Sequence, residues 1–337
     1  MSSHKETEKY FIDKCTEMLE NVPDYAHAYV RSIHYTTSPR TRYEYIKDIQ
    51  NFLTYAKEAL NIDITDVKNL QMLTKTNFEE YFEYLEHYEK DGKEYTNGRT
   101  SIKRKLSALR NFFGYLFESE LIRSDEIRKI KIPKLHKKEI IKMDRDEAST
   151  FLMAVESGTN LTKKEKDYHN KQCLRDTTIT HLMLSTGIRV SECAELDIND
   201  VDIKNHAIHI IRKGGNESTV YFSDKTEEIL KEYLEYREHL KNVPDDEQAL
   251  FLSSRRRRLS VRSIEVLIKK YAQRSLPLKK ITPHKLRSTY ATQLYKETGD
   301  IYLVAEALGH NDVTTTKNHY AEISEDHKKQ NRNKSGF

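Results

Sequence analysis

Four short motifs in the second half of the sequence carry side chains that suit chemistry on a phosphate group. The first is Arg189-Val-Ser-Glu192, in which a spacing of three residues places the guanidinium and the carboxylate on one face of a helix. Glu192 could therefore orient Arg189, although a purely structural ion pair would have the same sequence. Gly187 lies just before this motif and is a natural end for the apolar helix that precedes it.

A lysine and a histidine–arginine pair form the second and third motifs. Lys213 ends an alternating segment, 206–213, and the Gly-Gly that follows it predicts a β-hairpin returning along residues 218–222. His284 and Arg287 occupy the first turn of a helix that the preceding Thr-Pro caps and begins. Backbone N–H groups and the positive helix end favour an anion there. Both motifs are also common without function: lysines in hairpin turns are usually only solvated, and a histidine three residues before an arginine is a frequent pattern.

The fourth motif is Gly309-His310, with Tyr320 ten residues after the histidine. Periodic apolar residues predict a helix that ends at Gly309 and delivers His310 just beyond it. A phenol has a pKa near ~10, so Tyr320 must lose its proton as it attacks phosphorus. In the transition state of that attack the phosphate oxygens carry additional negative charge, and the planar guanidinium of an arginine can bind two of them at once. The sequence contains no P-loop, GxGxxG or carboxylate–histidine metal motif, so no cofactor and no metal are expected.

In this order and spacing, the four motifs and the tyrosine resemble those of the tyrosine recombinases, the phage integrase family. The resemblance covers the whole second half of the chain. It implies that an active-site tyrosine forms a 3′-phosphotyrosyl link with DNA while two arginines and a histidine contact the non-bridging oxygens. The lysine would protonate the leaving 5′-oxygen, His284 would assist proton transfer, and Glu192 would order the site. The catalytic residues implied are Arg189, Glu192, Lys213, His284, Arg287, His310 and Tyr320.

Two positions depart from the pattern of the family. The residue after Arg287 is usually histidine and is Ser288 here, but it does not belong to the catalytic set. The family usually places the nucleophile nine residues after the Gly-His histidine, whereas Tyr320 lies ten residues after His310. No other tyrosine follows Tyr302, so Tyr320 keeps the assignment, and the additional residue requires a bulge between the two.

The resemblance also implies partners and a biological role. In this family four copies bind two short inverted-repeat DNA sites and exchange strands through a Holliday junction. Asn21-Val-Pro-Asp-Tyr25 and Arg42-Tyr-Glu-Tyr-Ile46 look most similar to Xer enzymes that act alone. About 20 residues precede the helical domain, too few for the separate arm-binding domain of more elaborate integrases, which favours simple sites and chromosome-dimer resolution. The resemblance implies a homotetramer in the synaptic complex, and we expect the enzyme in the cytoplasm, associated with the nucleoid. The alternatives are integration or excision of a mobile element, and a DNA-binding relative that has lost catalysis.

Positive charge is concentrated in two segments, residues 99–138 and the arginine-rich run 255–262. Residues 99–138 contain twelve Lys/Arg against four Asp/Glu, although the net charge of the chain is only +4. Apolar residues spaced four and three apart predict a helix here, with a basic stripe beside its buried face. Such clusters are typical of proteins that bind the phosphate backbone of DNA, although solvated surface is the ordinary alternative. The predicted DNA-binding residues are Arg99, Lys103, Arg104, Lys105, Arg110, Arg255, Arg256, Arg257, Arg258 and Arg262.

The elements that must position these residues are mostly helices. Gly and Pro number only 10 and 6 among 337 residues, and 33% of residues are charged, which excludes collagen-like and largely disordered chains. The helical rhythm runs through Ile46, Leu53 and Ala56, and again from Phe78 to Tyr88. No apolar run is long enough to span a membrane, and the N-terminus lacks the apolar core of a signal peptide. The three cysteines have no spacing typical of a zinc site or of paired disulfides, which favours free thiols in a reducing cytosol.

We therefore expect a mainly α protein, with an N-terminal helical core-binding (SAM-like) domain and a C-terminal mostly helical catalytic domain that contains a small antiparallel β-sheet. The predicted boundaries follow the changes in charge and periodicity. They are a tail or short helix over 1–20, the DNA-binding helical domain over 21–128, a basic linker over 129–144, the catalytic domain over 145–324, and a tail for protomer–protomer docking over 325–337.

Overall fold

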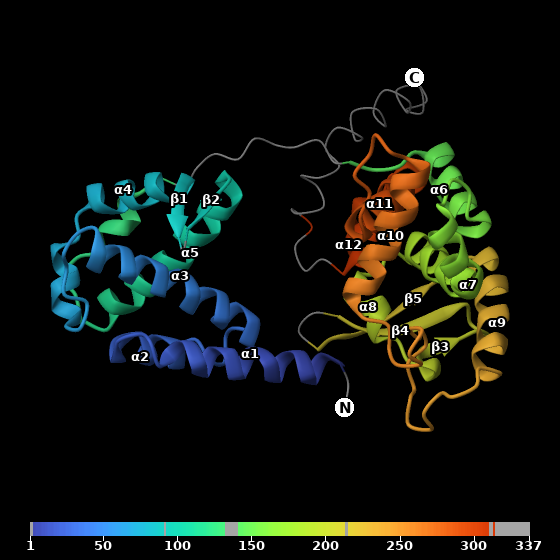
Figure 1. Cartoon of the computed structure of the whole chain (residues 1–337), viewed down its shortest axis with the longest axis horizontal. Coiled ribbons are helices and arrows are strands. Elements are labelled where there is room, and N and C mark those ends of the chain that lie inside the picture. The colour runs from blue at the N-terminus through green and yellow to red at the C-terminus, as the bar shows by residue number, and fades with distance from the viewer. Residues whose placement is uncertain (1–2, 91, 132–140, 213–214, 310–312, 314–337) are drawn as a thin grey trace, which may run out of the picture. The chain divides into compact units, whose positions relative to one another are not determined.

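The computed structural model describes residues 3–90, 92–131, 141–212, 215–309 and 313. The chain divides into two compact units, Met1–Lys138 and Glu139–Phe337, each with its own hydrophobic core (Figure 1). The boundary lies within the segment predicted as a linker: Ile130 is buried in the core of the first unit, and Met143 in that of the second. Both units are mainly helical and the strands are short, which confirms the predicted fold class.

The first unit is a bundle of helices with one β-hairpin. Helix α1, in the segment for which a tail or a short helix was predicted, packs against α3 and buries Cys15. Ser38 caps α3 by accepting a hydrogen bond from the backbone of Thr41, and Pro39 occupies the first helical position. The helices are α1 (Ser3–Leu19), α2 (Asp24–Ser32), α3 (Pro39–Glu58), α4 (Lys75–Glu86) and α5 (Arg99–Glu118), with 3₁₀ turns η1 (Val67–Met72) and η2 (Glu126–Lys129).

The core of the first unit is rich in aromatic rings. Phe52 of α3 stacks on Phe78 of α4 with 5.2 Å between ring centroids, and it meets the rings of Tyr81 and Phe113 edge-on at 5.0 and 5.6 Å. These three helices therefore share one core, to which each buried phenylalanine contributes about 1.5–3 kcal/mol. The apolar residues whose spacing predicted helices in α3 and α5 are buried, which confirms those predictions.

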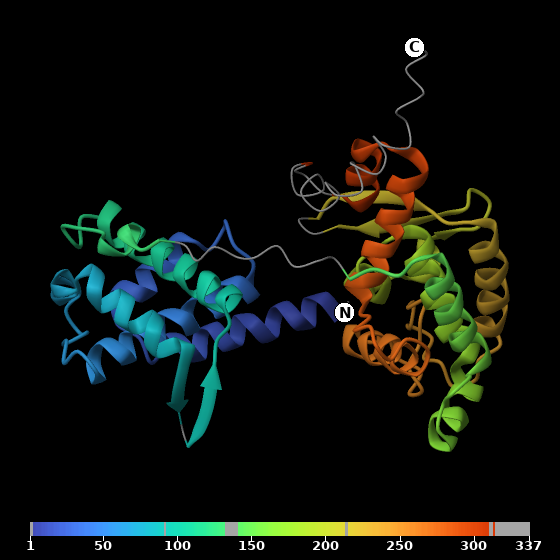
Figure 2. The same cartoon turned by 90° about the horizontal axis from the view of Figure 1, so that it is seen from above.

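The helical rhythm of α4 does not continue to Tyr88 as predicted. Helix α4 ends at Glu86, and β1 (His87–Lys90) pairs antiparallel with β2 (Lys93–Thr96). Tyr88 lies opposite Tyr95, and the two rings stack with centroids 5.3 Å apart. This cross-strand pair and Gly92, whose φ of 69° suits a hairpin turn, favour strands over a further helical turn. The hairpin extends away from the helices of its unit (Figure 2).

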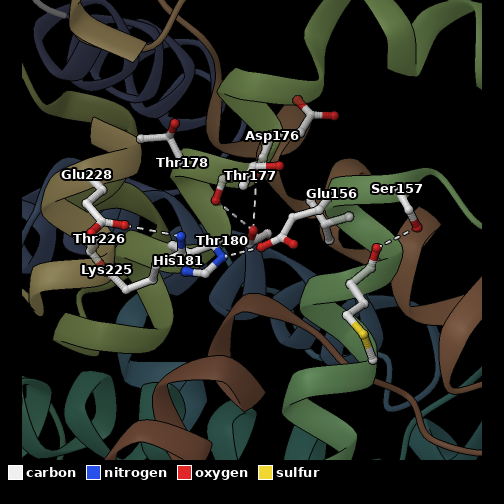
Figure 3. A network of polar contacts seen from close by, with 12 residues as sticks. Glu156, Ser157, Asp176, Thr177, Thr178, Thr180, His181, Lys225, Thr226 and Glu228 are labelled. Carbon is white, nitrogen blue, oxygen red and sulfur yellow. Dashed lines mark hydrogen bonds and ion pairs between the residues drawn. The ribbon is translucent and has the colours of Figure 1, made fainter. Parts of the chain in front are cut away.

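Helix α7 is the central element of the second unit, and α6, α9 and α11 pack around it. Several of its buried residues are threonines, whose hydroxyls return hydrogen bonds to earlier carbonyls of the helix, as Thr180 does to Asp176 and Thr177. His181 on the same helix pairs with Glu156 of α6 at 2.9 Å (Figure 3). The helices are α6 (Arg145–Ser157), α7 (Lys163–Thr186), α8 (Val190–Glu195), α9 (Asp224–Glu238), α10 (Val261–Ser275), α11 (Pro283–Thr298) and α12 (Ile301–Leu308), with a 3₁₀ turn η3 (Ile198–Asp200).

A small antiparallel sheet has the order β3 (Val201–Asp202), β4 (Ala207–Ile211), β5 (Glu217–Tyr221). The pairing of β4 with β5 confirms the predicted hairpin, and Ile208 lies opposite Val220, both facing the core. Helix α12 packs differently: Val304 and Leu308 are buried with residues of α11 in a small cluster separate from the main core of the unit.

Within these described residues, no helix is sufficiently long and apolar to cross a membrane. All three cysteines, Cys15, Cys173 and Cys193, are free, as predicted.

Candidate active site

The turn between α7 and α8 positions the first motif. Gly187 ends α7 in the left-handed conformation with a φ of 64°, and Arg189 becomes the N-cap of α8. One oxygen of Glu192 accepts the backbone N–H of Arg189 at 2.7 Å, and the other accepts its Nη1 at 2.7 Å. Glu192 is buried, whereas about a third of the Arg189 side chain (33%) is exposed. A single carboxylate thus fixes both the backbone and the guanidinium of Arg189, which faces solvent on one side.

Arg287 connects three segments that are distant in the sequence. It lies one turn into α11, which Pro283 begins as predicted, although the side chain of the N-cap residue Thr282 makes no capping hydrogen bond. Its guanidinium is buried and donates to the carbonyl of Gly187 at 2.6 Å and to the carbonyl of Leu308. Arg287 therefore joins the turn that carries Arg189 to the last turn of α12.

Of the other members of the predicted set, one is described and lies near Arg287, and the remaining three fall outside the part of the chain that the structure describes. His284 is exposed on the first turn of α11, one turn before Arg287. Lys213, His310 and Tyr320 lie outside the described residues. The residues that precede two of them are described, however, and are in contact: the guanidinium of Arg212 lies against Gly309. The segments carrying the second, third and fourth motifs are thus brought together as far as the structure describes them.

Two residues of this region were not singled out by the sequence. Arg212 donates from Nη2 to the carbonyl of Ala307 at 3.0 Å. Burial raises the pKa of Tyr290, an effect that the positive charges of Arg212 and Arg287 oppose. The ring of Tyr290 covers Gly187 so closely that a Cβ there would lie 2.2 Å from its Cδ1. Gly187 is thus required both for its left-handed φ and for this close approach.

The basic stripe on α5 is only partly available to DNA. Arg99 and Lys103 are exposed. The prediction that Lys105 binds DNA is corrected: it is buried and pairs with the buried carboxylate of Asp48 at 3.0 Å, where it balances that charge. Arg104 binds the same carboxylate at 2.7 Å but keeps 42% of its side chain exposed.

Arg110 is also corrected to a structural role, because its Nη2 donates to the carbonyls of Arg128 and Ile130 and so ties α5 to the end of the first unit.

The arginine run in the second unit divides in the same way. Arg255 and Arg257 are exposed, and Arg256 takes a left-handed φ of 59° in the turn between them. Arg258 is corrected to a structural role, because it donates to the carbonyls of Ala194 and Leu196 at 3.1 and 3.0 Å and pairs with a carboxylate.

Arg262 is exposed on the first turn of α10 and lies 3.2 Å from Glu265 of the same helix.

One group of described side chains has the composition of a metal site. His206, in the turn just before β4, lies 3.6 Å from Asp224 and 3.5 Å from Glu227 in the first turn of α9. Glu227 is already paired with Lys231 at 2.6 Å, and the Asp224 side chain is almost fully exposed. This cluster is held by surface ion pairs and belongs to elements other than the turn and helix ends that carry the four motifs.

Comparison with known proteins identifies the class. Residues 142–327 match the family model described as the phage integrase family, and residues 28–120 match the N-terminal SAM-like domain of phage integrases. The chain therefore belongs to the phage integrase family of tyrosine recombinases.

Its similarity to individual relatives is of the Xer type. It is 30% identical to the tyrosine recombinase XerS of Streptococcus agalactiae serotype III (strain NEM316), over 90% of this chain and 93% of that protein. It is 34% identical to the tyrosine recombinase XerC of Thermodesulfovibrio yellowstonii, over 65% of this chain and 70% of that protein. These similarities make it a Xer-like tyrosine recombinase, an enzyme of site-specific DNA recombination.

Two solved structures share the fold. One is the XerH site-specific recombinase in a post-cleavage complex with palindromic difH substrate, with a TM-score of 0.65 at 18% identity over 91% of this chain and 94% of that chain. The other is a lambda integrase dimer bound to a COC′ core site, with a TM-score of 0.62 at 17% identity over 87% of this chain and 96% of that chain. At these identities the comparison supports the fold alone.

Proposed function

We propose that this enzyme is a single Xer-type recombinase that resolves chromosome dimers in the cytoplasm, at the nucleoid, by cutting and rejoining double-stranded DNA at a short inverted-repeat site. The observation that carries the chemistry is the linkage made by Arg287, which joins the turn of Arg189 to the end of α12. The role is supported by the similarity to XerS, which extends over 90% of this chain.

In the proposed cleavage step, the phenolic oxygen of Tyr320 forms a bond to phosphorus as the bond from phosphorus to the 5′-oxygen breaks. Tyr320 loses its proton, with His284 assisting, and Lys213 gives a proton to the departing 5′-oxygen. The products are a 3′-phosphotyrosyl link and a free 5′-hydroxyl. A second 5′-hydroxyl attacks that link in the reverse chemistry, so strands are rejoined without ATP.

The arginines stabilise the charge that develops on the non-bridging oxygens. The pentacoordinate transition state carries more charge than the diester, and fixed guanidinium groups need no rearrangement when it forms. Glu192 holds Arg189 through its backbone and its side chain, and two carbonyls hold Arg287. In this proposal His310 joins the two arginines at the phosphate.

The proposal extends to assembly. Four copies would bind two sites and exchange strands in pairs through a Holliday junction, with Arg99, Lys103, Arg255 and Arg257 as exposed candidates for backbone contacts. The segment 325–337 would dock on a neighbouring protomer. Deleting it should leave the affinity for DNA nearly unchanged and lower the yield of recombinants. An equal loss of both would contradict the docking role.

Covalent capture tests the function directly. Wild-type enzyme and Tyr320→Phe are incubated with fragmented DNA of the source organism, denatured in SDS, and the DNA that stays attached to protein is sequenced. Adducts confined to wild type and concentrated at one chromosomal site would support dimer resolution. Adducts at the ends of a mobile element would assign the enzyme to integration or excision instead. Equal recovery from both proteins would refute Tyr320 as the nucleophile.

A further inference from the structure

Arg212 closes the hairpin of the second unit with its backbone. It follows β4 directly, its N–H donates to the carbonyl of Asn216 at 2.8 Å, and its carbonyl accepts from Gly215 at 3.0 Å. The position of the Arg212 backbone therefore sets where the turn of the hairpin begins. Lys213 is the next residue in the sequence.

The side chain of Arg212 fixes this point to the end of α12. Its Nη2 donates to the carbonyl of Ala307 at 3.0 Å, and Arg287 donates to the carbonyl of Leu308. Two guanidinium groups, one from the hairpin and one from α11, therefore hold the last two carbonyls of α12, where a positive charge is favourable.

Gly309, with a φ of 59°, makes room for this contact, since a Cβ there would lie 2.3 Å from Nη1 of Arg212 and 2.5 Å from its Cζ. The fit of the guanidinium against the glycine backbone leaves the hairpin end and the helix end little freedom to slide past one another.

The charges around Arg212 link it to the first motif as well. Burial lowers the pKa of Arg212, the carboxylate of Glu192 opposes that shift, and the positive charge of Arg189 adds to it. Arg212 is thus within electrostatic range of the ion pair of the first motif. Its Nη1 is buried and has no hydrogen-bond partner among the residues that the structure describes. Leaving a buried guanidinium nitrogen without a hydrogen bond costs free energy. The single bond to the end of α12 does not by itself account for that cost.

We propose that Arg212 is a positioning residue for DNA cleavage, which acts by holding the hairpin at the register from which Lys213 delivers a proton. The inference rests on the proposed function, in which Lys213 protonates the 5′-oxygen. Without the Arg212 side chain, the hairpin end loses its bond to Ala307 and its contact with Gly309. The acid would then be displaced from the leaving oxygen, while the arginines of the phosphate site keep their own partners.

Replacing the bridging 5′-oxygen of the scissile bond by sulfur distinguishes a defect in proton delivery from a defect in DNA binding or in the attack on phosphorus. Two DNA duplexes carry the site recovered by covalent capture, one with the natural 5′-oxygen and one with a bridging 5′-sulfur. A thiol has a pKa near ~8.5, so sulfur leaves as a thiolate and needs no acid, whereas an alkoxide does. Covalent adduct formation is measured in single turnover for wild type, Arg212→Ala, Arg212→Lys and Lys213→Ala.

We expect Arg212→Ala to cleave the natural DNA about 100-fold more slowly, the size of loss that a misplaced group of about 1 Å causes. On the sulfur-containing DNA it should approach the wild-type rate, as should Lys213→Ala. Arg212→Lys keeps the charge but not the planar fork, so it should lose less than alanine and be restored by sulfur in the same way. If Arg212→Ala does not fold, Arg212→Lys carries the same comparison.

Arg237 provides a matched control. It is a buried arginine of the second unit, whereas Arg212 is half-buried, and like Arg212 it donates to backbone carbonyls, here those of Glu247 and Ala249 at 3.1 and 3.4 Å. Arg237→Ala should lower the melting temperature and show no selective recovery on sulfur. Equal losses of Arg212→Ala on both DNAs, or no loss on either, would overturn the proposal. If wild type forms no adduct that Tyr320→Phe lacks, the proposed function itself fails, and this inference with it.

Discussion

Replacing Glu192 tests whether a buried carboxylate prepares Arg189 for catalysis. The two Glu192 oxygens each accept one hydrogen bond from Arg189, from its backbone N–H and from Nη1, both at 2.7 Å. Glu192→Gln keeps the shape but replaces one acceptor oxygen with a donor NH₂ and removes the charge. Glu192→Ala removes both acceptors and leaves the two Arg189 donors without their partner.

The expected losses follow from the strength of these bonds. A hydrogen bond to a charged group contributes about 1.5–3 kcal/mol and a neutral one about 0.5–1.5 kcal/mol. Glu192→Gln should therefore cost about 1.5 kcal/mol of transition-state stabilisation, or roughly a tenfold slower cleavage. Breaking a buried pair costs about 3–5 kcal/mol. Because a third (33%) of Arg189 is exposed to solvent, we place Glu192→Ala at the lower end of that range, on the order of 100-fold in rate.

The assay is single-turnover formation of the covalent protein–DNA adduct at saturating DNA, with the dissociation constant and the melting temperature measured alongside. Glu195→Gln, at the end of the same helix α8, is the matched control and should cleave at the wild-type rate. The reasoning fails if Glu192→Gln cleaves at the wild-type rate. It also fails if the alanine variant loses no more than the glutamine variant, or if weaker DNA binding accounts for the whole loss.

Three further predictions use other residues. Gly309→Ala should lower the melting temperature, because its Cβ meets Arg212 and its φ is left-handed, and the loss should be smaller when measured in Arg212→Ala. Lys105→Ala should destabilise the first unit to chemical denaturation without changing the salt dependence of DNA binding, whereas Lys103→Ala should reduce that slope by about 1. Hydrogen bonds from an arginine and a backbone N–H lower the pKa of Glu165 from 4.5 to about 2, so its folded form holds the proton less tightly than its unfolded form. The extra unfolding free energy of wild type over Glu165→Gln should be constant above pH 4.5 and disappear as the pH falls towards 2.

Local signals predicted several of the elements. Gly187 and Gly309 end helices in the left-handed conformation, Pro283 begins one, and the alternating residues before Gly214 form a strand. In each case the information lies within a few residues. The helix–strand boundary at Tyr88 was wrong because its decisive contact, the stacking on Tyr95, is made across a turn.

The assignment of basic residues was less accurate for the same reason. Lys105 is buried by its pairing with Asp48, which lies 57 positions earlier in the sequence. Arg258 is held by carbonyls that lie more than 60 positions earlier. Charge and helical spacing are identical for a side chain that reaches DNA and one that neutralises a buried carboxylate. Arg212 was missed because its carbonyl partner lies 95 residues later, although its place next to a hairpin lysine could have drawn notice.

Among the described helices of the second unit, α12 is short and packs outside the main core, so it should open by itself more readily than the central helix α7. It has only eight residues, too few to be stable in isolation, and Val304 and Leu308 pack in a cluster of four buried residues away from the main core. Its amide protons should therefore exchange with solvent through local opening, at a lower free energy than those of α7. The bonds from Arg212 and Arg287 oppose that opening at its last turn. Deuterium uptake by α12 thus measures how often this helix end leaves the guanidinium groups of Arg212 and Arg287, before any DNA is present.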